Sequence, residues 1–98
     1  MAIKKQYLKS KPVCKVTFEV AEKEATNVSV VGDFNKWNGE ATPLKKLKNG
    51  KFKAVLPFEK GNTYEFKYII DGNYVNEDNA DAFQWNDYAN AENSVLEL

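Results

Sequence analysis

Three side chains suited to binding a polar ring come together on one predicted hairpin. Asp71-Gly72 is a two-residue turn signal, so the residues on either side of it are expected to pair across two antiparallel strands. Directly opposed residues share a face of a sheet, and this register sets Lys67, Tyr74 and Asn76 on the outer side. A pyranose ring matches this set, because its C–H face stacks on an aromatic ring and its hydroxyls bond amines and amides.

Trp37 is the second candidate because it lies in a loop of small and polar residues, 32–38. Two interpretations are open: the indole caps the core from outside, or it is an exposed platform for a ligand. Phe34 is the better candidate for plugging the core. An exposed indole near amides and an amine suits a sugar, but it also suits a protein partner, because Trp and Tyr are common at interface hot spots. The sequence does not show that Trp37 reaches the face of the hairpin.

Other chemistry finds little support in the sequence. The chain has no His and a single Cys, which removes His-based catalysis and a cysteine-rich zinc site. A calcium loop beginning at Asp33 departs from the expected pattern, because Trp37 stands at its fifth position. Three aspartates in the long polar stretch could bind a cation or simply be solvated: Asp78, Asp81 and Asp87. We therefore expect no metal and no cofactor. We also expect no catalytic residue, because a domain of this size has little room for a hydrolase cleft.

The charge distribution argues against nucleic acid as a partner. All 14 basic residues are Lys, and 14 acidic residues balance them to a net charge of zero. Residues 1–60 hold thirteen Lys and six acidic residues, whereas residues 61–98 hold one Lys and eight acidic residues. This division indicates either two complementary faces of one domain or an electrostatic interaction surface.

Membrane insertion and secretion also find no signal. The Lys-rich N-terminus is not followed by an apolar segment, and no stretch is long and apolar enough to cross a bilayer. We therefore expect a cytoplasmic protein that does not contact membranes.

Period-two alternation and turn signals predict an all-β fold. Strands are expected at residues 14–20, 27–31, 44–47, 51–57, 63–70, 73–76 and 94–98. Asn49-Gly50 is a further hairpin signal, between the third and fourth of these strands. Short strands at this spacing are typical of a sandwich or barrel, and the length of 98 residues indicates one domain. Residues 77–93 are the anomaly, a long polar stretch whose three aromatic residues predict that it packs.

Three segments together resemble the family 48 carbohydrate-binding modules. They are VSVVGDFNKW at residues 28–37, YEFKYIIDGNY at residues 64–74 and NSVL at residues 93–96. The family includes the isoamylase N-terminal early set domains and the glycogen-binding domain of the AMP-activated protein kinase β subunit. The resemblance covers residues 11–98 and implies an immunoglobulin-like β-sandwich over residues 12–98, preceded by an N-terminal extension of residues 1–11.

The resemblance also implies a set of sugar-binding residues. Trp37 matches the family's stacking Trp, and Lys67 matches a Lys that hydrogen-bonds the sugar. Tyr74 stands where a second stacking Trp is usual, and Asn93 matches an Asn that binds sugar hydroxyls just before the last strand.

Four further candidate contacts are Asn35, Asn76, Trp85 and Tyr88. Trp85 or Tyr88 is a candidate to replace the bulky loop residue that clasps the glucan in glycogen-binding members.

The function that the resemblance implies is non-catalytic binding of an α-glucan: glycogen, starch or a malto-oligosaccharide. An alternative remains, because many early set domains contribute mainly to architecture. On that view the chain is a protein-interaction module associated with an α-glucan-processing enzyme, with weak or no sugar binding.

Overall fold

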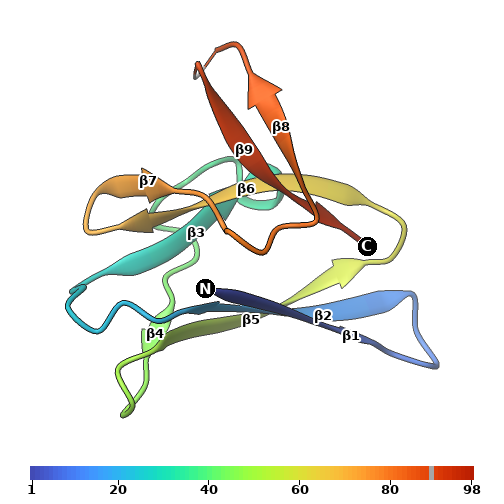
Figure 1. The fold of residues 1–98 in the computed structure, drawn as a ribbon. Coiled ribbons are helices and arrows are strands. Elements are labelled where there is room, and N and C mark those ends of the chain that lie inside the picture. The colour runs from blue at the N-terminus through green and yellow to red at the C-terminus, as the bar shows by residue number, and fades with distance from the viewer. Residues whose placement is uncertain (89) are drawn as a thin grey trace.

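Two antiparallel sheets pack face to face in the computed structural model, which describes residues 1–88 and 90–98 (Figure 1). The first sheet contains, in spatial order, β1 (Ala2–Tyr7), β2 (Val13–Val20), β5 (Phe52–Glu59) and β4 (Lys45–Lys46). The second contains β3 (Val28–Gly32), β6 (Thr63–Ile70), β9 (Ala91–Glu97) and β8 (Ala82–Asn86), with β7 (Asn73–Val75) also paired to β6. The expected all-β sandwich is confirmed.

The core lies between the sheets and is built from the alternating residues of the long strands. Phe18 of β2 is fully buried, and its ring centroid lies 5.4 Å from that of Phe66 and 6.3 Å from that of Tyr68, both on β6. Phe34, from the 3₁₀ turn η1 (Asp33–Asn35), is half-buried and lies 5.2 Å from the ring of Phe58. Phe34 therefore closes this end of the core, as the sequence predicted.

The N-terminal segment differs from the expected extension. Residues 2–7 form β1, which pairs with β2 from Ala2↔Glu19 to Tyr7↔Cys14, so the first sheet begins inside residues 1–11. Lysines concealed this strand from pattern analysis, because an edge strand that carries Lys has no clear apolar alternation. The later strands agree with the expected ranges to within a few residues, except β8, which was not expected.

Both predicted hairpin turns are present. Asp71 and Gly72 have φ angles of 47° and 86°, the positive values that a type I′ turn requires. The register is the predicted one for three pairs, from Ile70↔Asn73 to Tyr68↔Val75. Asn49-Gly50 closes the turn between β4 and β5.

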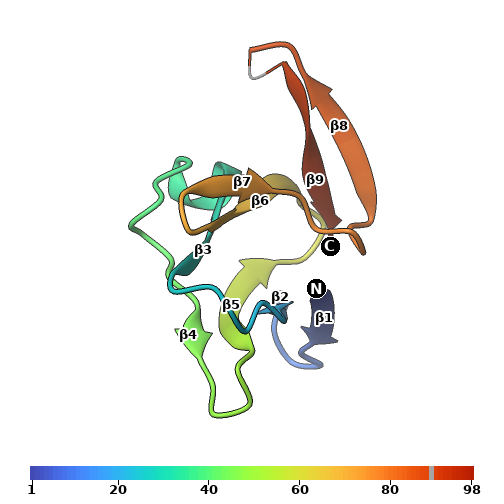
Figure 2. The same cartoon turned by 60° about the vertical axis from the view of Figure 1, so that its left-hand side comes forward.

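The long polar stretch 77–93 contains β8 and the first residues of β9. These two strands form a hairpin that projects beyond the sandwich (Figure 2). Its aromatic side chains are more exposed than the sequence analysis expected, with Phe83 47% and Trp85 51% exposed. The tip therefore stands away from the core, because the first sheet does not extend beneath it (Figure 2).

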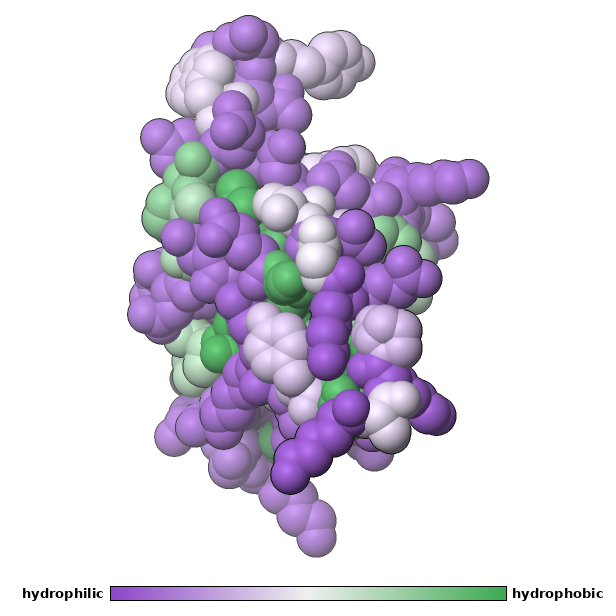
Figure 3. Space-filling model, turned by 90° about the vertical axis from the view of Figure 1, so that its right-hand side faces the viewer, coloured by the Kyte–Doolittle hydropathy of each residue, from purple (hydrophilic) through white to green (hydrophobic). Residues whose placement is uncertain are grey.

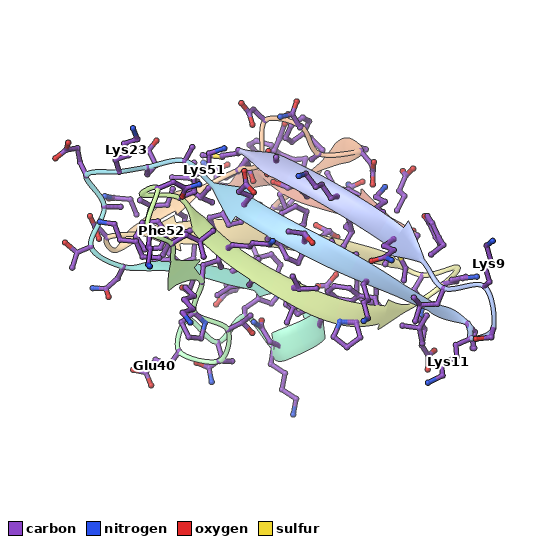
Figure 4. The ribbon with its side chains drawn as sticks, turned by 90° about the horizontal axis from the view of Figure 1, so that it is seen from below. Lys9, Lys11, Lys23, Glu40, Lys51 and Phe52 are labelled. Atoms are coloured by element: carbon purple, nitrogen blue, oxygen red, sulfur yellow. The ribbon has the colours of Figure 1, made fainter. Side chains whose placement is uncertain are left out.

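Lysines from the first sixty residues lie at both ends of the first sheet. In the view onto its outer face, Lys9 and Lys11 lie at one end and Lys23 and Lys51 at the other (Figure 4). The side of the sandwich where the two sheets meet is mostly hydrophilic, with only small apolar patches (Figure 3). Within the described residues, no helix has the length and apolar character needed to cross a membrane.

Candidate functional site

The candidate site forms where one edge of β6 changes its partner. Along this edge, residues 63–66 pair with β9 and residues 68–70 pair with β7. Lys67 lies between the two paired stretches, so β7 and β9 diverge on either side of it. Asn76 joins the diverging strands, since it donates to the Glu92 carbonyl at 2.9 Å and accepts from the Ser94 hydroxyl at 3.0 Å.

A cleft of about 820 Å³ opens at this divergence. Its volume is in the range of small-ligand sites. The side chains around it come from the η1 loop, β6, β7 and the β8–β9 hairpin: Trp37, Lys67, Tyr74, Asn86, Tyr88, Ala91 and Asn93. The structure thus brings together five of the eight predicted site residues and adds Asn86 and Ala91.

The Trp37 loop is fixed against β6. A Cβ atom on Gly32 would lie 2.4 Å from the Glu65 carbonyl oxygen, so only Gly allows this close approach. Asn35 accepts from the Gly32 N–H at 2.9 Å and donates to the Val30 carbonyl at 3.0 Å. Asn35 is therefore a structural residue of the loop and does not line the cleft.

Trp37 is half-buried and turns its side chain toward the cleft, whereas Phe34 packs on the core. Its indole N–H donates to the Asp33 carboxylate at 3.3 Å, and its backbone N–H donates to the Gly32 carbonyl at 3.0 Å. The Trp37 side chain therefore lies at the cleft and is not part of the buried core cluster.

Tyr74 and Asn93 border the cleft from β7 and β9. Tyr74 is 64% exposed, which leaves its ring accessible. Asn93 is only 3% exposed, and its Nδ2 donates to Oε1 of Glu65 at 3.1 Å. This bond orients the amide, so the oxygen is the atom that Asn93 can offer as an acceptor.

The remaining predicted contacts differ in position. Tyr88 is fully exposed at the tip of the hairpin and lines the cleft. Trp85 pairs with Glu92, on the opposite face of β8 from Asn86, so it points away from the cleft. Its indole donates to Asp87 at 2.7 Å. Sequence analysis missed Asn86, although alternation over residues 82–86 was the available signal.

A buried polar cluster supports the site from the core side of the second sheet. Glu77 is 0% exposed, accepts from the Tyr68 hydroxyl at 2.8 Å and donates its backbone N–H to Ser94 at 2.8 Å. Burial raises the pKa of the Glu77 carboxyl above its ordinary value. Burial and the nearby Glu77 carboxylate likewise raise the pKa of the Tyr68 hydroxyl.

Asp81, Asp87 and Asp33, which the sequence offered as cation ligands, make other contacts. Asp81 accepts from Lys5 at 2.6 Å and from the Glu97 N–H at 2.8 Å, and Asp87 holds Trp85. Asp33 accepts from Trp37 and from the Glu65 N–H. Among residues 1–88 and 90–98 there is no group of three or more His, Cys, Asp or Glu side chains arranged to bind a metal.

The sequence matches one family model and several curated enzymes. The model of carbohydrate-binding module 48 (isoamylase N-terminal domain) matches residues 6–84. The chain is 36% identical over 66 residues to the 1,4-alpha-glucan branching enzyme GlgB of Pseudoalteromonas atlantica, covering 67% of this chain and 9% of the enzyme.

Two further branching enzymes show the same partial coverage. The enzyme of Deinococcus radiodurans is 45% identical over 53 residues, which are 53% of this chain and 8% of the enzyme. The enzyme of Chlamydia abortus is 41% identical over 56 residues, which are 55% of this chain and 8% of the enzyme. The chain therefore spans less than a tenth of the length of each of these relatives.

Proposed function

The chain belongs to the carbohydrate-binding module 48 (isoamylase N-terminal domain) family, and from this premise we propose that its cleft binds an α-glucan without catalysing a reaction. The ligand class is glycogen, starch or a malto-oligosaccharide. The observation that carries the proposal is the convergence of Trp37, Lys67, Tyr74 and Asn93 on one cleft from separate parts of the sequence. The names of the relatives, which are 1,4-alpha-glucan branching enzymes, support the ligand class.

Each residue has a distinct role in the proposed complex. The rings of Trp37 and Tyr74 stack on the apolar faces of glucose units, which gives contact area with little loss of side-chain freedom. The Lys67 ammonium donates to sugar oxygens, and the Asn93 amide oxygen accepts from a hydroxyl. Tyr88 contacts the glucan from the hairpin side.

The lining of the cleft supports binding without hydrolysis. A glycoside hydrolase uses two carboxyl groups on either side of the scissile bond. Among the described residues that line the cleft there is no Asp or Glu. This lining supports the proposal of a binding cleft in preference to a hydrolase site.

Native electrophoresis in gels cast with and without glycogen tests the proposal. Glycogen is expected to retard the wild type, and Trp37→Ala is expected to weaken binding about tenfold, because one aromatic stacking contact contributes about 1–1.5 kcal/mol. Trp85→Ala is the matched control, since it removes an exposed Trp that points away from the cleft. Lys67→Ala is likewise expected to weaken binding, and its matched control is Lys48→Ala, because Lys48 does not line the cleft.

The outcomes separate three cases. Loss of retardation in Trp37→Ala but not in Trp85→Ala supports the cleft. Loss in Trp85→Ala alone moves the site to the other face of the hairpin. Equal mobility of the wild type in both gels contradicts glucan binding and favours the second candidate function.

The second candidate function is docking to an α-glucan-processing enzyme. Two observations favour it: the matched segment is less than a tenth of each branching enzyme, and lysines lie at both ends of the outer face of the first sheet (Figure 4). On this view the lysines contact an acidic surface of the enzyme. Lys15→Glu/Lys53→Glu, on that face, should then abolish salt-sensitive pull-down of a purified branching enzyme, whereas Trp37→Ala should not.

A further inference from the structure

Asp33 links the indole of Trp37 to strand β6. Its Oδ2 accepts a 2.9 Å hydrogen bond from the backbone N–H of Glu65, and its Oδ1 accepts a 3.3 Å hydrogen bond from Nε1 of Trp37. Asp33 itself is exposed and is not among the residues that line the cleft. One carboxylate therefore connects the ring to the strand that carries Lys67.

The backbone under the ring requires such support. Lys36 and Trp37 have φ angles of 57° and 58°, in the left-handed region that residues other than Gly rarely adopt. Two successive residues in this conformation persist only when the surrounding structure holds them. Two of the contacts that do so are the backbone bond from Trp37 to Gly32 and the indole bond to Asp33.

The same contact decides what the indole can offer a ligand. Since the N–H of Trp37 donates to Asp33, the only hydrogen-bond donor of the ring is already used, and the apolar surface of the ring is what it can offer a ligand. Polar recognition is then left to Lys67 and Asn93. A ring that rotated freely would need to be ordered at binding, which costs affinity.

We propose that Asp33 is a positioning residue, which sets the orientation of the Trp37 ring and thereby the affinity of the cleft for glucan without touching the ligand. The binding part of this inference rests on the proposed function. Its structural part, the orientation of the indole, can be measured without a ligand.

Asp33→Asn tests the inference, with Asp81→Asn as the matched control. Asp81 also accepts one backbone N–H, from Glu97, and one side-chain donor, Lys5, but it lies outside the cleft. Affinity for maltoheptaose is expected to fall about fivefold in Asp33→Asn and to change less than about twofold in Asp81→Asn. The indole N–H resonance of Trp37 in a ¹H–¹⁵N spectrum is expected to shift in Asp33→Asn, while that of Trp85 stays in place.

A double-mutant cycle with Trp37→Phe separates positioning from general support of the loop. Phe keeps a stacking ring but has no N–H for Asp33 to accept, so Asp33→Asn should weaken binding by less than about twofold in the Trp37→Phe background. An equal loss of affinity in both backgrounds overturns the inference, as does an unmoved Trp37 indole resonance. If Asp33→Asn does not fold, Asp33→Glu serves, because it keeps the charge and changes the reach to the indole.

The experiments distinguish failure of the proposed glucan binding from failure of the proposed positioning role of Asp33. If the wild type does not bind maltoheptaose, the proposed function fails, and the resonance of the Trp37 indole still decides whether Asp33 orients the ring. If the wild type binds and Asp33→Asn binds equally well, the proposed function stands and the positioning role is wrong.

Discussion

The hydroxyl of Tyr68 donates a 2.8 Å hydrogen bond to the carboxylate of Glu77, and both side chains are fully buried on the core side of the second sheet. Lys67, the next residue along β6, faces the cleft on the opposite side. A buried carboxylate with no Lys within ion-pair distance among the described residues is costly to ionise. This pair therefore links the stability of the sheet to pH.

Glu77→Gln should remove a loss of stability that the wild type shows as the pH rises. Burial raises the pKa of Glu77 in the folded state, so the folded chain holds this proton more tightly than the unfolded chain. Unfolding free energy then falls as the pH rises from the ordinary Glu value of 4.5 through the raised folded value. Urea titrations at pH 5 and pH 7.5 should show that the free energy of unfolding of Glu77→Gln, relative to that of the wild type, is higher at pH 7.5 than at pH 5.

The control for this experiment is Glu59→Gln, an exposed carboxylate on β5. A hydrogen bond from Glu77 is the main cause that lowers the pKa of the neighbouring Asp78. The stabilisation of the fold by ionised Asp78 is therefore lost only as the pH falls below the ordinary Asp range. If the unfolding free energies of the wild type and Glu77→Gln differ by the same amount at both pH values, the role of Glu77 is contradicted.

Tyr68→Phe should destabilise the fold by about 1–3 kcal/mol, because it removes the hydrogen-bond donor of the buried Glu77 carboxyl group. The change in volume is small, so packing contributes little. The loss should be smaller in the Glu77→Gln background, where Tyr68 no longer donates to a carboxyl group. If the effects of the two substitutions on the urea midpoint are additive, Tyr68 and Glu77 do not stabilise each other.

Glu65→Ala should weaken glucan binding without unfolding the chain. The Glu65 carboxylate orients the Asn93 amide through a 3.1 Å bond, while its backbone N–H, which Asp33 holds, is unaffected by the truncation. Calorimetric titration with maltoheptaose should show affinity reduced about threefold to fivefold. Glu97→Ala, an exposed carboxylate on β9 outside the cleft, is the control. A loss of equal size in an Asn93→Ala background would show that Glu65 acts by another route.

Local patterns sufficed to predict most of the strands and the hairpin that carries Lys67 and Tyr74. The Asp71-Gly72 turn fixes its own register, because positive φ angles at both residues match the twist of the flanking strands. Strand β8 was missed, since its residues project beyond the first sheet and neither face is continuously buried. The same reason hid Asn86, whose place in the cleft depends on how the hairpin is aimed.

The pairing of β9 with the edge of β6 that also pairs with β7 could not be predicted from sequence. It joins residues far apart in the chain, and no local pattern encodes it. Continued pairing along the hairpin would set Asn76 opposite Lys67, but in the described strands β7 ends at Val75 and Asn76 hydrogen-bonds to β9 instead. Motif matching identified Asn93 without this geometry, but only the structure shows why it faces Lys67's side of the sheet.

Tyr74→Trp should strengthen glucan binding. Tyr74 is 64% exposed at the border of the cleft, so a larger ring meets no packed neighbour and adds stacking area. The gain should be about twofold to fivefold in affinity for maltoheptaose, and Tyr74→Ala should show a loss of similar or larger size. Tyr7→Trp is the matched control, because Tyr7 is 48% exposed on β1, away from the cleft. If Tyr74→Trp binds no better than the wild type while Trp37→Ala loses binding, the glucan stacks on Trp37 and passes Tyr74 without contact.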